Sequence, residues 1–249
     1  MRGNYEDATV ETMDLAHYDL VQLKFDGMWV QVEIDGREAK ILNRHGKPVE
    51  VVELGDKHPR SVFVGEWMKG TQRTKGQAVH VVAFDCAAAN GWSCEARTYL
   101  QRMEELKAVE MPRELGNVLG RVVFPETWHP REAETLWKDV ETGKEEGLIL
   151  RRNAMPFGAT VARVKPLVEL DFYATEVHWK NGKPVAVGGS EYPGGPELVK
   201  ARLTVGSDYS GFQVGRCFKV QGQERTERGS IRFPFFRGWH LEKTFDLAK

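Results

Sequence analysis

Apolar and polar residues alternate in the first part of the chain, as is typical of half-buried β-strands. Residues 18–34 predict an extended segment. In its second half Val30, Val32 and Ile34 alternate with polar residues. Asp35-Gly36 predicts a hairpin turn, and residues 39–42 predict the return strand. Further short strands are expected at 62–67, 79–84, 147–151 and 160–165.

Two helices are predicted between these strands. Ser93 would cap the first, whose apolar side includes Leu100 and Leu106. The second begins after Pro130 and stops at Gly143. Many strands and few helices predict an α+β fold with a largely antiparallel arrangement.

A different pattern begins after a boundary at residues 166–171. Short strands are separated by expected turns at Asn181-Gly182, Gly188-Gly189, Gly194-Gly195, Gly206 and Gly215. About 80 residues of this kind are typical of a small Greek-key β-barrel such as an OB-fold. We therefore expect two domains, residues 1–168 and 169–249.

Composition excludes several classes of protein. No apolar run approaches about 18 residues, so we expect no membrane span. Three cysteines without a C-x-x-C pair argue against a disulfide framework or a structural zinc site, and favour the reducing cytoplasm. The whole chain has a net charge of -1, but residues 170–249 hold 12 basic and 9 acidic residues. That basic balance permits a polyanionic partner without requiring one.

The segment Lys24-Phe25-Asp26-Gly27 is the sharpest local feature. Taken alone, it is most simply a solvated lysine beside a turn. The alternative is a lysine nucleophile, and only a neutral amine can attack phosphorus. Because a lysine pKa is about 10.4 in water, such a site needs neighbouring cations or a metal. Basic residues do recur in later strand segments, at Arg151, Arg163 and Lys165. Walker and Rossmann glycine loops are missing, so any nucleotide would be bound without them.

The order of several segments resembles the ATP-dependent DNA ligases of the covalent nucleotidyltransferase superfamily. The lysine segment 24–27 resembles the family's first motif, K-x-D-G. The other segments that resemble family motifs are 43–47, 64–67, 82–85, 145–151, 161–166 and 229–237. Each motif is weak alone, but together they run in the family's order from Gln22 to Arg237.

The resemblance implies a fold, an activity and cofactors. The fold would be a mostly antiparallel, ATP-grasp-like nucleotidyltransferase domain followed by an OB-fold domain. The enzyme would use ATP and Mg²⁺ (or Mn²⁺). Lys24 would attack the α-phosphate and form lysyl-AMP, AMP would move to the 5′-phosphate at a DNA nick, and the 3′-hydroxyl would displace it. The partner would be nicked double-stranded DNA.

The resemblance also assigns residues by their place in the motifs. The catalytic residues would be Lys24, Asp26, Arg44 and Lys165. The nucleotide would be bound by Gln22, Lys24, Arg44, Glu66, Phe84, Arg163, Lys165 and Arg232. Phe84 would stack on the base and Glu66 would hold the ribose, although a lone Phe is more often a core residue. Glu146 is the first choice of metal ligand and Glu66 the second. Two alternatives stay open, namely that Gln22 is an ordinary surface residue of a strand and that Asp26 is a structural turn residue.

Two other functions stay open, one because of departures from the family pattern and one because it would use the same chemistry. Trp29 stands where the first motif has Arg, and Arg151 and Arg163 stand where the family generally has Lys. A non-catalytic nucleic-acid-binding protein with a degenerate transferase domain is therefore one alternative. An RNA ligase or a capping-type nucleotidyltransferase is the other.

The position of the motifs also leads to expectations about size and DNA contacts. Little chain precedes Gln22, so we expect a monomeric minimal ligase without a separate N-terminal DNA-binding domain. Residues 69–76 form a basic segment that is either a DNA contact or a solvated hairpin tip.

Overall fold

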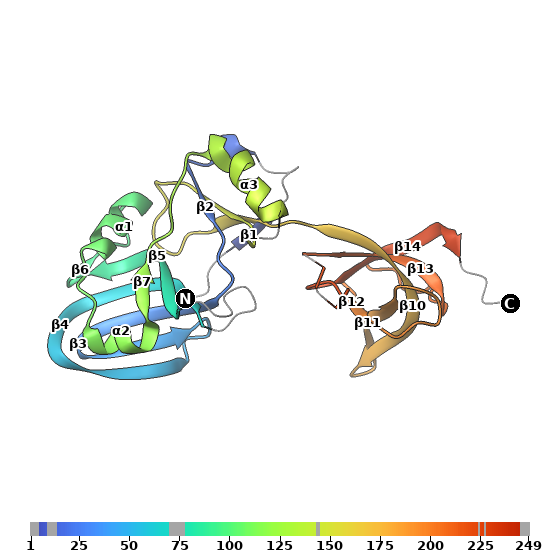
Figure 1. The fold of residues 1–249 in the computed structure, drawn as a ribbon, viewed down its shortest axis with the longest axis horizontal. Helices are drawn as coiled ribbons and strands as arrows, with labels where there is room; N and C mark the ends of the chain where they lie inside the picture. The colour runs from blue at the N-terminus through green and yellow to red at the C-terminus, as the bar shows by residue number, and fades with distance from the viewer. Residues whose placement is uncertain are drawn as a thin grey trace. The chain divides into compact units, whose positions relative to one another are not determined.

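The computed structural model describes residues 5–8, 14–69, 78–142, 145–223, 225–226 and 228–244. The chain forms two compact units, Met1–Lys165 and Pro166–Lys249 (Figure 1). Among the described residues, no helix has the length and apolar character needed to cross a membrane. The expected basic loop lies almost wholly outside the described residues, since 70–76 are not among them.

The larger sheet of the first unit has five strands. Its antiparallel order is β3 (Met28–Asn43), β4 (Pro48–Met68), β5 (His80–Ala89) and β6 (Trp92–Ser93), and β7 (Arg121–Val123) pairs in parallel with β5. Helix α1 (Tyr99–Lys107) packs against β5 and helix α2 (Arg113–Leu119) against β4. Alternate side chains of the strands and the buried sides of both helices form one apolar core.

The smaller sheet of the first unit has four strands and its own core. Its order is β1 (Tyr5–Ala8), β9 (Val161–Val164), β8 (Leu148–Arg151) and β2 (Leu20–Leu23). The short helix η1 (Leu15–His17) precedes β2, and η2 (Pro130–Glu132) leads into α3 (Ala133–Glu141). Helix α3 covers this sheet and buries Ala133 and Val140 against Leu148 and Leu150. The chain crosses from the smaller to the larger sheet through residues 24–27, between β2 and β3.

The second unit is a closed five-stranded barrel. Around the barrel the order is β10 (Val168–Lys180), β11 (Lys183–Ser190), β12 (Val199–Arg202), β14 (Phe235–Thr244) and β13 (Arg216–Gly222). The β10–β13 pairing closes it. Aromatic rings fill the interior, with Phe218 5.6 Å from Phe236 and Phe236 5.0 Å from Trp239 between centroids. The expectation of an α+β, mostly antiparallel chain is therefore confirmed.

The expected hairpin turn at Asp35-Gly36 is wrong. Strand β3 runs through this position, and the register shifts around Gly36, whose φ is 62°. A glycine with positive φ is what a β-bulge uses to bend a strand without ending it. The actual turn lies between β3 and β4, where Gly46 has a φ of 73°.

The expected cap of the first helix is also wrong. Ser93 belongs to β6, whereas Thr98 caps α1 through a capping box with Gln101. Leu100 is 42% exposed and faces away from the core. The second helix is confirmed as η2 and α3, while α2 was not predicted because its seven residues give too short a periodic signal.

The expected turn at Gly188-Gly189 lies inside β11 instead. A Cβ at Gly189 would come within 2.8 Å of Phe218 and 2.9 Å of Phe172. The glycine therefore leaves room for rings inside a narrow barrel, a requirement that a sequence pattern does not distinguish from a turn.

Candidate active site

Two lysines share one buried carboxylate in the first unit. Lys24 Nζ lies 2.5 Å from Glu146 Oε2, and Lys165 Nζ pairs with Oε1 of the same group. The exposed fractions of the three side chains are 14%, 8% and 11% for Lys24, Glu146 and Lys165. Lys24 Nζ also donates to the carbonyl of Phe25 at 3.1 Å. The structure therefore brings together the predicted nucleophile, the first-choice metal ligand and a predicted phosphate-binding lysine.

Two glycines explain why these segments approach so closely. A Cβ at Gly147 would lie 2.2 Å from the carbonyl oxygen of Val164, and a Cβ at Gly27 would lie 3.0 Å from that of Trp67. A side chain at Gly147 would push these segments apart, and one at Gly27 would force its neighbours to shift. The Lys24 amide also donates to the Gly147 carbonyl at 2.8 Å, which ties the segment that holds Lys24 to the start of β8.

A pocket opens beside this cluster. It is lined by Gln22, Leu23, Lys24, Phe25, Glu66, Phe84, Pro125, Ile149 and Arg151. Four predicted site residues, from three separate parts of the sequence, therefore meet at one cavity. The half-buried ring of Phe84 is 5.7 Å from the Arg151 guanidinium, so an aromatic face and a cation occupy the same wall.

Glu66 places a carboxyl group in this pocket, and one of its oxygens lacks a hydrogen bond within the described part of the chain. Its Oε2 is buried and has no hydrogen-bond partner within the described part of the chain. Burial raises its pKa from 4.5 to about 8, although the Lys24 charge opposes the shift. Glu146 and Asp26 add to it. A carboxyl group in this state will ionise when a cation or hydroxyl donors reach it.

The raised pKa of Glu66 predicts a pH-dependent stability. Between about pH 4.5 and 8 the folded protein holds a proton that the unfolded chain has released. The free energy of unfolding must therefore fall as pH rises through this window. We expect the Tm of ligand-free protein, measured by differential scanning fluorimetry, to fall more steeply for the wild type than for Glu66→Gln.

The control for that experiment is Glu53→Gln, since Glu53 lies exposed on the same strand. This variant should keep the wild-type slope of Tm against pH. Parallel slopes for the wild type and Glu66→Gln would contradict the assignment.

Lys165 follows directly after β9. The pKa of Lys165 is lowered, and burial is the largest cause. The nearby charges of Lys24 and Arg163 lower this pKa further, whereas Glu146 raises it. Because burial disfavours the charged form of Lys165, an anionic ligand that binds here would stabilise it. Arg163 lies two residues earlier, half-buried in β9 and paired in register with Ile149.

Gln22 is not the surface residue that remained an alternative. It is 2% exposed, and its Nε2 donates to Tyr99 Oη at 2.7 Å and Thr127 Oγ1 at 3.1 Å. Its Oε1 accepts from Arg151 Nε at 2.9 Å. Because both amide hydrogens are engaged, a base could reach only the remaining acceptor capacity of Oε1 without breaking these bonds.

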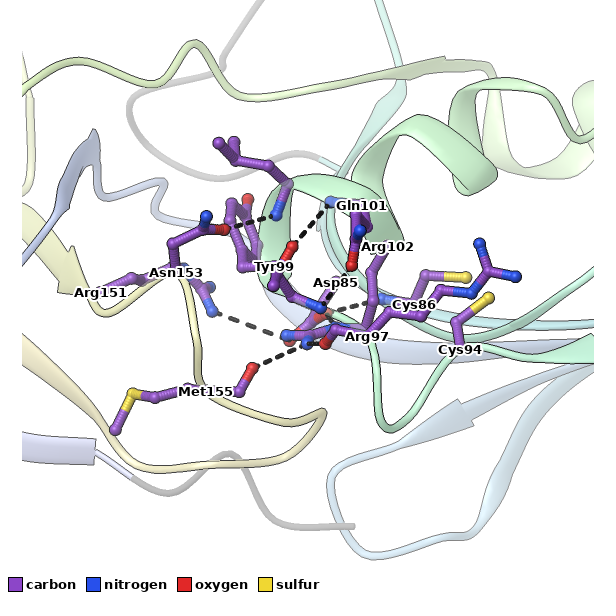
Figure 2. A network of polar contacts seen from close by, with 12 residues as sticks. Asp85, Cys86, Cys94, Arg97, Tyr99, Gln101, Arg102, Arg151, Asn153 and Met155 are labelled. Carbon is purple, nitrogen blue, oxygen red and sulfur yellow. Dashed lines mark hydrogen bonds and ion pairs between the residues drawn. The ribbon is translucent and has the colours of Figure 1, made fainter.

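A buried ion pair joins Arg102 to Asp85, which lies directly after Phe84 in the sequence (Figure 2). Asp85 accepts from Arg102 Nε at 2.6 Å and from Nη2 at 3.1 Å, and Arg151 Nη1 lies 3.8 Å away. Arg102 also donates to two backbone carbonyls, at 2.6 and 2.8 Å. The network therefore joins β5, α1 and the end of β8 behind the pocket.

Breaking this pair should be costly. Arg102→Leu would leave the buried Asp85 charge with only the more distant Arg151 guanidinium at 3.8 Å, and we expect a loss of about 3–5 kcal/mol in the free energy of unfolding in urea. Arg97→Leu is the control, because its exposed pair with Glu105 should be worth less than about 1 kcal/mol. Similar losses for both variants would show that the network carries no special stability.

The remaining predicted residues are placed as follows. Asp26 is half-buried and near enough to Glu66 to raise its pKa. Arg44 is exposed in the β3–β4 turn. Its charge lowers the pKa of Glu66, but less than the other neighbouring charges shift it. Arg232 belongs to the second unit, so its role toward a nucleotide stays a prediction.

Trp29 is buried at 8% exposure, directly opposite Glu66 in the β3–β4 ladder. Residues paired in this way share one face of a sheet. Its indole therefore supplies an apolar neighbour where the family has a cation, which is consistent with the burial of Glu66.

Three residues of the site had no signal in the sequence. Tyr99 and Thr127 hold the amide of Gln22, and Arg102 holds Asp85. None lies in a segment that resembles a family motif, and their roles depend on contacts across 77, 105 and 17 positions of the chain.

Comparison with protein families and with curated proteins gives no match. Solved structures do match. One, from a study of Lig E DNA ligases that bind DNA with a minimal scaffold, has a TM-score of 0.68 at 16% identity and covers 96% of this chain and 100% of its own. Pmar-Lig_Pre has a TM-score of 0.68 at 14% identity and covers 97% of this chain and 68% of its own. A mycobacterial DNA ligase D in complex with ATP has a TM-score of 0.50 at 17% identity and covers 97% of this chain and 95% of its own.

At this level of identity the likeness concerns the fold. It extends over nearly the whole chain and includes both units. The resemblance indicated by the motifs is therefore confirmed at that level: the chain has the fold of the ATP-dependent DNA ligases.

Proposed function

We propose that this protein is an ATP-dependent DNA ligase that seals nicks between a 3′-hydroxyl and a 5′-phosphate through a covalent lysyl-AMP. The observation that carries the proposal is the cluster in which Lys24 and Lys165 share Glu146 beside the pocket lined by Glu66 and Phe84. The ligase fold supports it independently.

Lys24 is the proposed nucleophile. Its Nζ, once deprotonated to solvent, forms a bond to the α-phosphorus of ATP while the bond from that phosphorus to the bridging oxygen breaks. Pyrophosphate leaves with the electron pair. Lys165 and Arg163 would stabilise the negative charge on the phosphate oxygens, and the Phe84 ring would stack on adenine. Gln22, Asp26 and Arg44 would position the nucleotide.

The two later steps transfer AMP to the nick and then release it. The DNA 5′-phosphate oxygen attacks the lysyl-AMP phosphorus, and the phosphorus–nitrogen bond breaks to regenerate Lys24. The 3′-hydroxyl then loses its proton to solvent and attacks the 5′-phosphorus, and AMP leaves with the electrons of the bond that breaks.

The acidic residues of the site fit Mg²⁺. Glu146 and Glu66 offer the hard oxygen ligands that this ion prefers, and Glu66 Oε2, which has no partner among the described residues, is consistent with a ligand that arrives later. Glu146 would hold the ion by exchanging part of its contact with the lysines, with Glu66 as the second ligand or a ribose contact. When bound, the ion neutralises charge on phosphate oxygens.

The barrel is the proposed OB domain of this monomeric, cytoplasmic enzyme, and the first unit is its adenylation domain. Basic side chains of the barrel would contact DNA phosphates without reading sequence, as a sealing enzyme requires. Arg232 would additionally contact ATP. The guanidinium of Arg232 lies 5.7 Å from the Phe233 ring.

The alternatives weigh less against these observations. A degenerate binding module would have no need of two lysines around one buried carboxylate, which supports catalysis despite Trp29. An RNA ligase or a capping enzyme would use similar chemistry and is separated by experiment.

The test uses a duplex with a labelled 5′-phosphate at one nick, ATP and Mg²⁺. We expect sealed product with ATP and DNA strands, at least about tenfold faster than with GTP or with RNA on both sides of the nick. A matched nick with a 5′-hydroxyl should not react. Covalent adduct without sealing of the DNA nick would contradict the proposed substrate, and faster reaction with GTP would favour the capping-type alternative.

A further inference from the structure

Three neighbouring strands of the barrel bring together a carboxylate, a thiol and an imidazole. Asp171 lies on β10, Cys217 on β13 and His240 on β14, and β13 pairs with both other strands. Phe172 and Phe218, the next residues along β10 and β13, are in the barrel core. Because side chains alternate along a strand, Asp171 and Cys217 lie on the outer face.

The potential ligand atoms of these three side chains all lie within 4.8 Å of one another. His240 Nε2 is 2.6 Å from Asp171 Oδ1. The Cys217 side chain is fully buried, and His240 and Asp171 are 19% and 34% exposed. The group is therefore compact and closed toward the protein but accessible from solvent on its outer side.

The backbone of β14 is irregular at this place. Phe218 pairs with Trp239, whereas Arg216 pairs with Thr244, so two steps along β13 correspond to five along β14. His240 lies in this extra length of strand, opposite the part of β13 that contains Cys217. Trp239, opposite Phe218, packs against the barrel core, so alternation places His240 on the outer face with Asp171 and Cys217, and the extra length of β14 lies beside Cys217.

We propose that Asp171, Cys217 and His240 form a binding site for a transition-metal ion of the zinc type. Sulfur, imidazole nitrogen and carboxylate oxygen are the donors that Zn²⁺ accepts, and three protein ligands leave a fourth, tetrahedral position for water. A thiolate, a carboxylate and a neutral imidazole together carry two negative charges, which one divalent ion balances. Mg²⁺ prefers oxygen ligands only and is a poor match.

The bound ion links the three strands and stabilises the barrel. A ligand that binds only the folded state raises its stability in proportion to the logarithm of ligand concentration over Kd. The site is separate in chemistry from the carboxylates of the adenylation pocket. It has no sequence signature, because its ligands are single residues on three strands and none forms a C-x-x-C pair.

The experiment uses the full chain, stripped of metal with EDTA and titrated with Co²⁺ under reducing conditions. We expect a thiolate-to-cobalt charge-transfer band that saturates at one equivalent and is displaced by Zn²⁺, together with a rise in Tm on adding Zn²⁺. Wild-type protein without such a band would overturn the proposal, and this result does not depend on any variant folding.

Variants identify the ligands. Cys217→Ser should abolish the band, and His240→Ala and Asp171→Asn should each weaken Co²⁺ binding by at least about tenfold. Each variant is first checked for a wild-type circular dichroism spectrum, and for any that fails the check the band is followed instead in the milder His240→Gln or Asp171→Ser.

Matched controls exclude other sites. His178→Ala removes the histidine of a second group of potential ligands in the barrel, Glu176, His178 and Glu197, and Cys94→Ser removes a thiol of the first unit. Neither should change the band. A band that survives Cys217→Ser, or one lost in Cys94→Ser, would assign the metal elsewhere and overturn the proposal.

Discussion

Lys24→Ala and Lys24→Arg should both fail to form any covalent AMP adduct. The alanine variant removes the nucleophile. The arginine variant keeps a cation that can pair with Glu146, but a guanidinium stays protonated and cannot supply the neutral amine that attacks phosphorus. Loss of adduct in both variants would therefore separate nucleophilic chemistry from simple charge.

The measurement is an intact-mass spectrum after incubation with ATP and Mg²⁺, on protein first stripped of AMP with pyrophosphate. Lys40→Arg is the control, because Lys40 is an exposed lysine of the same unit that pairs with Glu38. It should give the full adduct, and peptide mapping of the wild type should place AMP on Lys24. An adduct on another lysine in Lys24→Arg would contradict the assigned nucleophile.

Neither change at Lys24 should unfold the protein. Glu146 keeps its ion pair with Lys165 when Lys24 is truncated, so no buried carboxylate is left without a counter-ion. A wild-type circular dichroism spectrum checks this before the activity is interpreted.

Lys165→Ala should slow adduct formation by about 10²- to 10³-fold, the effect of removing one preorganised group that stabilises transition-state charge. Lys165 contacts the carboxylate that also holds Lys24, so a charge placed here lies next to the proposed nucleophile. The rate constant is measured in single turnover across ATP concentrations. We expect the loss mainly in the maximal rate and less in the ATP concentration at half-maximum.

Two further variants make that result interpretable. Lys165→Arg should recover part of the rate, because the charge remains although its geometry differs. Lys180→Ala, at an exposed lysine of the barrel, should behave as the wild type. A loss confined to ATP affinity would mean that Lys165 binds the substrate without assisting the chemistry.

The local predictions from sequence were accurate where one segment carried its own signal. Strands β8 and β9 and helix α3 lie where apolar periodicity and flanking glycine or proline indicated them. The same method failed at Asp35-Gly36, because a bulge and a hairpin turn use the same kind of dipeptide. It also missed α2, whose short length gives little periodicity.

The amino-acid sequence by itself determined the α+β class, the two-part organisation and the short polar segments that hold Lys24, Glu66, Glu146 and Lys165. Alternation with period two assigns each residue to a face of its strand, and a glycine or a charged residue in a motif is visible locally. Only the tertiary structure decided that Glu146 pairs with a lysine 122 positions earlier, that Gln22 is engaged by Tyr99 and Thr127, and that Cys217 meets His240. The physical reason is that hydrophobic patterning fixes which face is buried but not which strands become neighbours, and these contacts exist only between neighbouring strands and loops.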